Sequence, residues 1–273
     1  MSRLDRFLFA PVASAPVAGF RVAFAVVLLA AFWPEGRQPI GSLARLPGAA
    51  ALWDGVFLTH AYWALCVAAL VAFAAAVGGR ASAAAAAILL LPLTPLRGAL
   101  SHQVLLFSLL AFSLLRQHRR PLPGQTAGPI WPLRLIQIQL SALYAVNAWA
   151  KLTPAYLSGE VLVGLSRVMP NFLADLSDGF LHLGPLAVPV SVCAIGTVAI
   201  EAALAVGFWI PRLRLATAAL GVGFHLSLQW VLEIGWLDWT CMFLYLAFLL
   251  PFERAPTQET VASPSPVGLA PGR

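Results

Sequence analysis

Long apolar segments with very few charges recur along the whole chain, and they limit what it can fold into. They lie at residues 15–33, 55–78, 81–97, 101–115, 132–151, 187–209, 212–233 and 235–252. About 20 apolar residues are enough for an α-helix to cross a bilayer, where a helix satisfies its own backbone hydrogen bonds. Only 10% of the residues are charged, against roughly a quarter in soluble chains. The sequence therefore predicts an all-α, polytopic transmembrane helical bundle of about eight segments.

The segment boundaries suggest one membrane domain over residues 1–252 and a tail. Pro92 and Pro95 interrupt the third segment, so segments three and four are expected to be short or re-entrant. The first segment lacks a small-x-small cleavage site and is read as a retained helix rather than a signal peptide. Residues 253–273 are rich in proline, serine and alanine and are expected to form a disordered cytoplasmic tail.

Basic residues orient the predicted bundle. The net charge is +6, but the arginines are scattered singly, which favours topology signals over nucleic-acid binding. A cytoplasmic N-terminus places more of them inside, namely Arg3, Arg6, Arg80, Arg116, Arg119, Arg120, Arg212, Arg214 and Arg254. We therefore expect a multi-pass protein of the cell membrane with both termini cytoplasmic. The loop 152–186 would lie outside, with an interfacial helix in "SGEVLVGLSRVM".

Common catalytic and metal-binding motifs are absent from the sequence. Cys66, Cys193 and Cys241 lie in apolar stretches without CxxC spacing, which argues against a disulfide framework or a zinc site. There is no P-loop, GxSxG, HExxH or dinucleotide fingerprint. No metal is predicted.

The fifth segment carries a polar stripe that ends in a lysine. Its members share one helical face: Gln137, Ser141, Tyr144, Asn147 and Lys151. Such a stripe has to face protein or water rather than lipid. A polar seam between helices explains it as well as a site does, and Lys151 alone is also explained by snorkelling to the headgroups.

A second stripe lies in the seventh segment. His225, Gln229 and Glu233 follow at intervals of four residues and, in the proposed orientation, lie towards the outer side. His102 begins the fourth segment from the same side. A lone buried histidine is more often a satisfied core group, but three costly groups, Lys151, His225 and His102, at one membrane depth favour a site.

Arg21 and Glu201 form a different pair in the prediction. Both come out in the inner third of the membrane, on segments that run in opposite directions. An unpaired charge at that depth would be expensive, so we expect a structural ion pair between their helices.

Four stretches resemble a known family when taken in order. They are "APVAGFRVAFAVVLL", "LSHQVLLFSLLAF", "LRLIQIQLSALYAVNAWAKLTPAYLSGE" and "FHLSLQWVLEIGWLDWTCMFLYL". Over residues 4–252 the chain resembles the HTTM domain, the membrane domain of vitamin K-dependent gamma-glutamyl carboxylase and its bacterial relatives.

The resemblance implies roles for particular residues. Lys151 matches the family's catalytic lysine, and His102, His225 and Arg21 match residues of the same domain. In the carboxylase the lysine deprotonates vitamin K hydroquinone, and oxygen and carbon dioxide take part in the later steps. The implied catalytic residues here are Lys151, His225 and His102. The polar residues that share their stripes, Tyr144, Asn147 and Gln229, are expected to bind the cofactor. An amine in apolar surroundings keeps a neutral fraction that can act as a base.

Two functions remain open from the sequence. The first is a quinol-dependent oxygenase (epoxidase) or carboxylase, a lyase-type membrane enzyme that uses a reduced quinone (menaquinol or vitamin K hydroquinone), O2 and CO2. The carboxylase has a soluble β-rich portion after its membrane domain, so a protein partner would have to supply such a domain here. The second is a non-enzymatic membrane protein, such as a transporter, an immunity factor or a subunit of a membrane complex. Convergence of Lys151 and His225 on one apolar pocket would favour the enzyme.

Overall fold

The computed structural model describes residues 2–37, 56–93, 100–116, 122, 124–168, 176, 178–232 and 236–251. Its helices and strands are, in chain order, α1 (Arg3–Phe9), β1 (Pro11–Ala13), α2 (Ser14–Arg37), α3 (Val56–Ala74), α4 (Arg80–Leu90), the 3-10 turn η2 (Leu91–Leu93), α5 (Leu100–Ser113), β2 (Thr126–Pro129), α6 (Trp131–Ala150), α7 (Pro154–Leu157), α8 (Glu160–Val168), β3 (Phe180–Leu183), β4 (Leu186–Pro189), α9 (Val190–Gly207), α10 (Arg214–Leu232), α11 (Trp236–Leu244) and α12 (Leu246–Leu249).

Each of the eight apolar segments contains a helix, and local sequence explains several of the boundaries. The third segment becomes α4 followed by the turn η2 at Pro92, as the proline predicts. Pro132 lies in the first turn of α6, where a missing backbone N–H costs nothing. The hydroxyl of Thr153 caps α7 by accepting a hydrogen bond from the backbone N–H of Tyr156.

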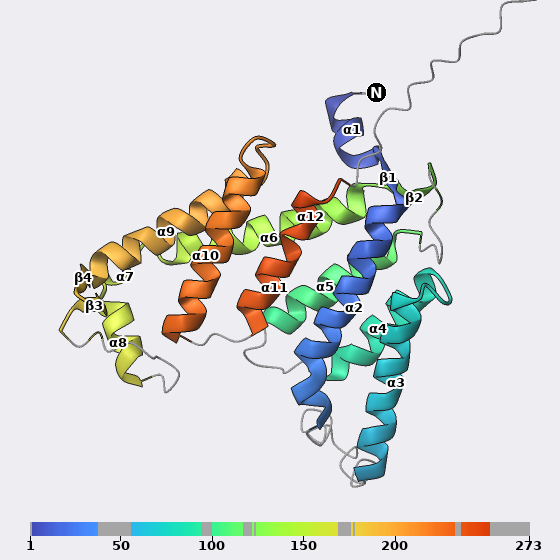
Figure 1. Cartoon of the computed structure of the whole chain (residues 1–273), viewed down its shortest axis with the longest axis horizontal. Coiled ribbons are helices and arrows are strands. Elements are labelled where there is room, and N and C mark those ends of the chain that lie inside the picture. Colours follow the sequence, from blue (N-terminus) through green and yellow to red (C-terminus); the bar gives the residue numbers. More distant parts are fainter. Residues whose placement is uncertain are drawn as a thin grey trace, which may run out of the picture.

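The helices form two connected groups. α2, α3, α4, α5 and α11 pack together in one part of the molecule, and α6 lies against α9 in the other (Figure 1). α6 also packs on α5, and α10 packs on both α9 and α11, so these contacts join the groups. The far end of α9 carries α7, α8 and the β3–β4 hairpin (Figure 1).

An aromatic cluster fills the core of the first group. The rings of Phe20 and Phe112 lie 5.4 Å apart, and the ring of Phe243 lies 5.1 Å from that of Phe20 and 5.4 Å from that of Phe24. All four side chains are buried. These contacts hold α2, α5 and α11 together through large apolar surfaces.

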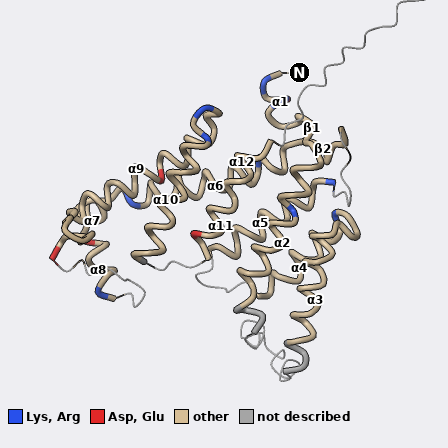
Figure 2. The backbone as a smooth tube through the Cα atoms, viewed as in Figure 1, with Lys and Arg blue, Asp and Glu red and all other residues tan. Residues whose placement is uncertain are grey.

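The outside of the helices is apolar. Large exposed side chains occur on almost every long helix, among them Val26, Leu65, Phe107, Val146 and Leu226. Figure 2 shows the helices almost entirely without charge along their length, with most charged residues at turns and ends. An apolar exterior of this extent is what lipid, rather than water, would cover.

Two described helices are both long enough and apolar enough to cross a membrane. They are residues Ser14–Trp33 of α2 and Val190–Gly207, which is α9. The apolar helices at His60–Ala74, Arg80–Leu93, Leu100–Ser113 and Trp236–Leu249 are shorter than a full span. The mostly helical fold is therefore established, whereas eight complete crossings remain a proposal.

The sequence predicts helices only, but the described part of the structure also contains four short strands. β1 pairs with β2, which fastens the start of α2 to the segment before α6, and β3 pairs with β4 as a hairpin, both antiparallel. The helix expected in "SGEVLVGLSRVM" is present as α8, with no buried residue. The predicted disordered tail at 253–273 lies outside the described residues.

Candidate functional site

Lys151, the only lysine in the sequence, lies at the end of α6. Its Nζ is 2.5 Å from Oε1 of Glu201 on α9 and 5.8 Å from the ring centre of Tyr156 on α7. The lysine side chain is 27% exposed and the glutamate side chain 5%. Because α7 begins only three residues after Lys151, the chain turns there and places Tyr156 beside the amine.

A second contact fixes the alignment of α6 with α9. Nε1 of Trp209 donates a hydrogen bond to Oγ of Ser141, 2.8 Å away. Ser141 therefore faces Trp209 while Lys151 faces Glu201, so the helices are antiparallel and α9 extends well beyond the end of α6. Lys151 lies beside the interior of α9 rather than at its outer end.

This alignment corrects the expected ion pair between Arg21 and Glu201. Glu201 binds Lys151 instead. Nε of Arg21 donates to the backbone carbonyl of Ala74 at 3.0 Å. Ala74 is the last residue of α3, where helix carbonyls lack partners and a positive charge is favourable. Arg21 thus joins α2 to α3. The predicted pair was wrong because it assumed that every segment crosses in the same register, which put Glu201 at the depth of Arg21.

His225 is the centre of a buried hydrogen-bond chain. Its Nδ1 lies 2.6 Å from Oδ1 of Asp238, and its Nε2 lies 2.6 Å from the hydroxyl of Tyr144. The Tyr144 hydroxyl also lies 2.6 Å from that of Tyr245. All four side chains are at most 4% exposed. The chain, Asp238–His225–Tyr144–Tyr245, connects α11 through α10 and α6 to the residue that precedes α12.

The chain and the lysine pair are electrostatically connected. Glu201 interacts with both Lys151 and His225. Oε2 of Glu201 and Oδ2 of Asp238 are buried, and neither has a hydrogen-bond partner among the described residues. The lysine pair and the His225 chain are therefore close enough to interact electrostatically through Glu201.

His102 lies elsewhere. Its Nε2 is 3.1 Å from the carbonyl oxygen of Ala31, and its ring packs edge-on against Phe32 with ring centres 4.4 Å apart. Both partners belong to α2, so His102 contributes to the contact of α5 with α2. Among the described residues, none of its contacts reaches Lys151 or His225.

The remaining stripe residues differ in their surroundings. Gln137 is buried, accepts from Arg134 at 2.8 Å and donates to the carbonyl of Ala247 at 2.5 Å, so it forms part of a helix–helix seam. Asn147 is half-buried one turn before Lys151, and Gln229 is half-buried one turn after His225. Glu233 lies outside the described residues.

Two residues of the network, Asp238 and Tyr245, were not predicted from the sequence. Asp238 reads as a loop acid near the start of the last segment, and Tyr245 as one of several aromatic residues. The signal was available for Asp238: it is an acid in "GWLDWTCMFL", where a charge is costly unless it is paired. Nothing in the sequence singles out Tyr245.

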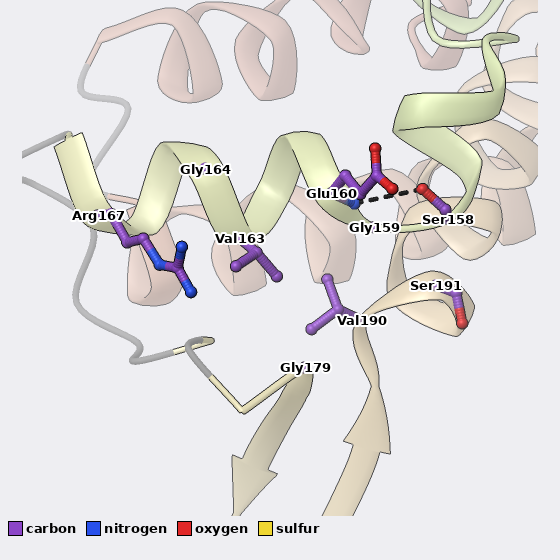
Figure 3. A pocket seen from close by; sticks show the side chains of 9 residues that line it. All are labelled: Ser158, Gly159, Glu160, Val163, Gly164, Arg167, Gly179, Val190 and Ser191. Carbon is purple, nitrogen blue, oxygen red and sulfur yellow. Dashed lines mark hydrogen bonds between the residues drawn. The ribbon is translucent and has the colours of Figure 1, made fainter.

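A hollow of about 340 Å³ lies at the far end of α9, apart from the network. Figure 3 shows it between α8, with Glu160 and Arg167, and the start of α9, with Val190 and Ser191. None of the expected site residues lines it. In the described part of the chain, no group of three or more His, Cys, Asp or Glu side chains is arranged to hold a metal ion.

Comparison with known proteins gives one family. The model of the HTTM domain matches residues 98–251, which include His102, both residues of the lysine pair and the whole His225 chain. No curated protein and no solved structure matches the chain. The match covers more than half of the sequence and agrees with the resemblance noted above, so the chain belongs to the HTTM domain family.

Proposed function

We propose that the chain is a multi-pass protein of the cell membrane with both termini on the cytoplasmic side. Its apolar exterior and its buried polar interior, which includes Arg21, Arg134 and Glu201, support this proposal. The bias of arginines in the sequence towards one side supports the orientation.

We further propose that Lys151 accepts a proton from a lipid-borne reduced quinone. One observation carries the proposal: the amine is partly exposed, and it is bound to a buried carboxylate whose second oxygen lacks a hydrogen-bond partner among the described residues. The ring of Tyr156, whose centre lies 5.8 Å from Nζ, gives an apolar surface beside the amine. A reduced quinone would supply an acidic hydroxyl and electrons for oxygen, and menaquinol and vitamin K hydroquinone share this chemistry.

The residues present can manage that proton. A proton shared between Nζ of Lys151 and Oε1 of Glu201 leaves the amine neutral whenever it resides on the carboxylate. The neutral amine can then take a proton from outside. The carboxylate of Glu201, which is bound to the amine and also interacts electrostatically with His225, can offset the change in charge. Asn147 lies one turn away on the same face and is suited to hold a ring oxygen.

Menaquinol consumption tests the proposal. The purified protein is reconstituted in lipid with menaquinol, O2 and CO2, and the quinone products are followed by mass spectrometry. Lys151→Ala and Lys151→Arg should both abolish turnover, since a guanidinium stays protonated and is no base. Arg167→Ala on the exposed helix α8 removes the same charge and serves as the matched control. Near-normal turnover in Lys151→Arg would show that Lys151 does not act as a base.

The non-enzymatic alternative has one observation in its favour. His102 is not brought to Lys151, and Gln137, Ser141 and Tyr144 use their polar groups in contacts between helices. A polar stripe that only joins helices suits a transporter, an immunity factor or a subunit of a membrane complex. Wild-type protein that leaves menaquinol unchanged under these conditions would favour this alternative. A carboxylase would additionally need a partner with a soluble, substrate-binding domain.

A further inference from the structure

Asp238 lies where a helix favours a negative charge. It is the acidic residue in the first turn of α11, at the end of the helix dipole that attracts anions. Its Oδ1 is 2.6 Å from Nδ1 of His225, and both side chains are buried. A carboxylate only accepts hydrogen bonds, so the short contact requires a proton on Nδ1.

The second ring nitrogen then has a defined role. In a neutral imidazole with its proton on Nδ1, Nε2 is an acceptor. The hydroxyl of Tyr144, 2.6 Å away, therefore donates to Nε2, and its oxygen accepts from the hydroxyl of Tyr245. The four residues form a chain in which every hydrogen bond points towards Asp238.

We propose that Asp238 is a positioning residue that keeps a proton on Nδ1 of His225 in both charge states of the ring. His225 then gains and loses its second proton at Nε2, on the side of Tyr144. Only the purpose of this proton exchange rests on the proposed function; the position of the proton does not. The same carboxylate–imidazole arrangement fixes a histidine tautomer in hydrolases.

The other groups around the ring leave this assignment in place. Oε1 of Glu201 is bound to Lys151, and Glu201 interacts with the ring electrostatically rather than through a hydrogen bond among the described residues. The Cys241 thiol interacts with Tyr144 and is a weak partner. The carboxylate of Asp238 is thus the strongest acceptor at either ring nitrogen.

Nitrogen NMR of ring-labelled histidine in lipid nanodiscs measures the tautomer directly. His225→Gln identifies the resonances of His225 by their loss. In the wild type, Nδ1 should carry the proton and Nε2 should appear as an unprotonated acceptor at neutral pH. Tyr144→Phe should keep the proton on Nδ1. Asp238→Asn should give a mixed or reversed pattern, because an amide can donate as well as accept, and Asp238→Glu should restore the wild-type pattern.

A wild-type ring with its neutral-state proton on Nε2, or an Asp238→Asn spectrum identical to that of the wild type, would overturn the inference. If Asp238→Asn does not fold, the wild-type and Tyr144→Phe spectra decide. Where quinol turnover exists, Asp238→Asn should lower kcat about 100-fold, the effect of a positioned acid–base group, with little change in KM. Absence of turnover in the wild type would defeat the proposed function and leave the tautomer result standing.

Discussion

Lys151 and Glu201 join α6 to α9 through one short contact of 2.5 Å between Nζ and Oε1. Removing only the lysine would leave a buried carboxylate without its partner. We expect Lys151→Met to lower the free energy of unfolding by about 2 kcal/mol, less than for a fully buried pair because the lysine is partly exposed. The double variant Lys151→Met/Glu201→Leu should recover much of this loss. Thermal unfolding in detergent measures both.

A second cycle serves as the control. Arg21→Met and Glu201→Leu should have additive effects, because Arg21 bonds the carbonyl of Ala74 rather than Glu201. Coupling between Arg21 and Glu201, and none between Lys151 and Glu201, would contradict the geometry of the pair.

The single lysine also reports the proposed orientation. A membrane-impermeant amine reagent can modify only Lys151 and the N-terminal amine, and peptide mapping separates the two. In right-side-out vesicles we expect Lys151 to be labelled and the N-terminus to be protected, with the reverse in inverted vesicles. Glu201→Leu should speed the labelling, because it frees the amine. Protection of Lys151 in right-side-out vesicles together with labelling in inverted ones would show that the topology is the reverse of the one proposed.

Gly221 on α10 makes room for Tyr245. A Cβ at this position would lie 2.7 Å from Cζ of the tyrosine ring, far inside normal contact distance. Gly221→Ala should therefore displace the end of the His225 chain and destabilise the protein by about 1–3 kcal/mol. Gly223→Ala, two residues along the same helix and with nothing within 4 Å, is the matched control. It should be neutral or stabilising in thermal unfolding.

The β3–β4 hairpin carries a pH-dependent contact. Nε2 of His182 lies 2.7 Å from Oδ2 of Asp178, and this hydrogen bond holds the pKa of Asp178 below its usual value. A lowered pKa stabilises the fold at pH values above the unfolded value of about 3.9, and the effect is lost as the pH falls through the folded pKa. His182→Ala should raise the pKa of Asp178 towards that reference. NMR titration of the aspartate carboxyl groups measures the change.

The sequence predicted the helices well because their apolar length is a local property. The proline at 92 marked the end of α4, and the pattern in "SGEVLVGLSRVM" marked α8. It did not predict β1 and β2, whose pairing joins residues more than 100 positions apart.

Partnerships within the site were harder to predict. Depth along a helix can be estimated from residue counts, but lateral position and register cannot. His102 has the depth of a site residue yet packs on α2, and Glu201 lies at the level of Lys151 because α9 is offset from α6. Asp238 was missed because it stands near a segment end, where acids are usually solvated.

The two contacts between α6 and α9 also bear on how such helices find their alignment. Apolar surfaces slide past one another in lipid at little cost, since each register buries similar groups. Ser141 and Lys151 are separated by about 15 Å along the axis of α6. Their partners, Glu201 on α9 and Trp209 two residues after its end, are separated by about 12 Å. A shift by one turn would break both contacts together and strand a charge in lipid. This register is therefore markedly lower in free energy than the registers one turn away. The association of the two helices is cooperative for that reason.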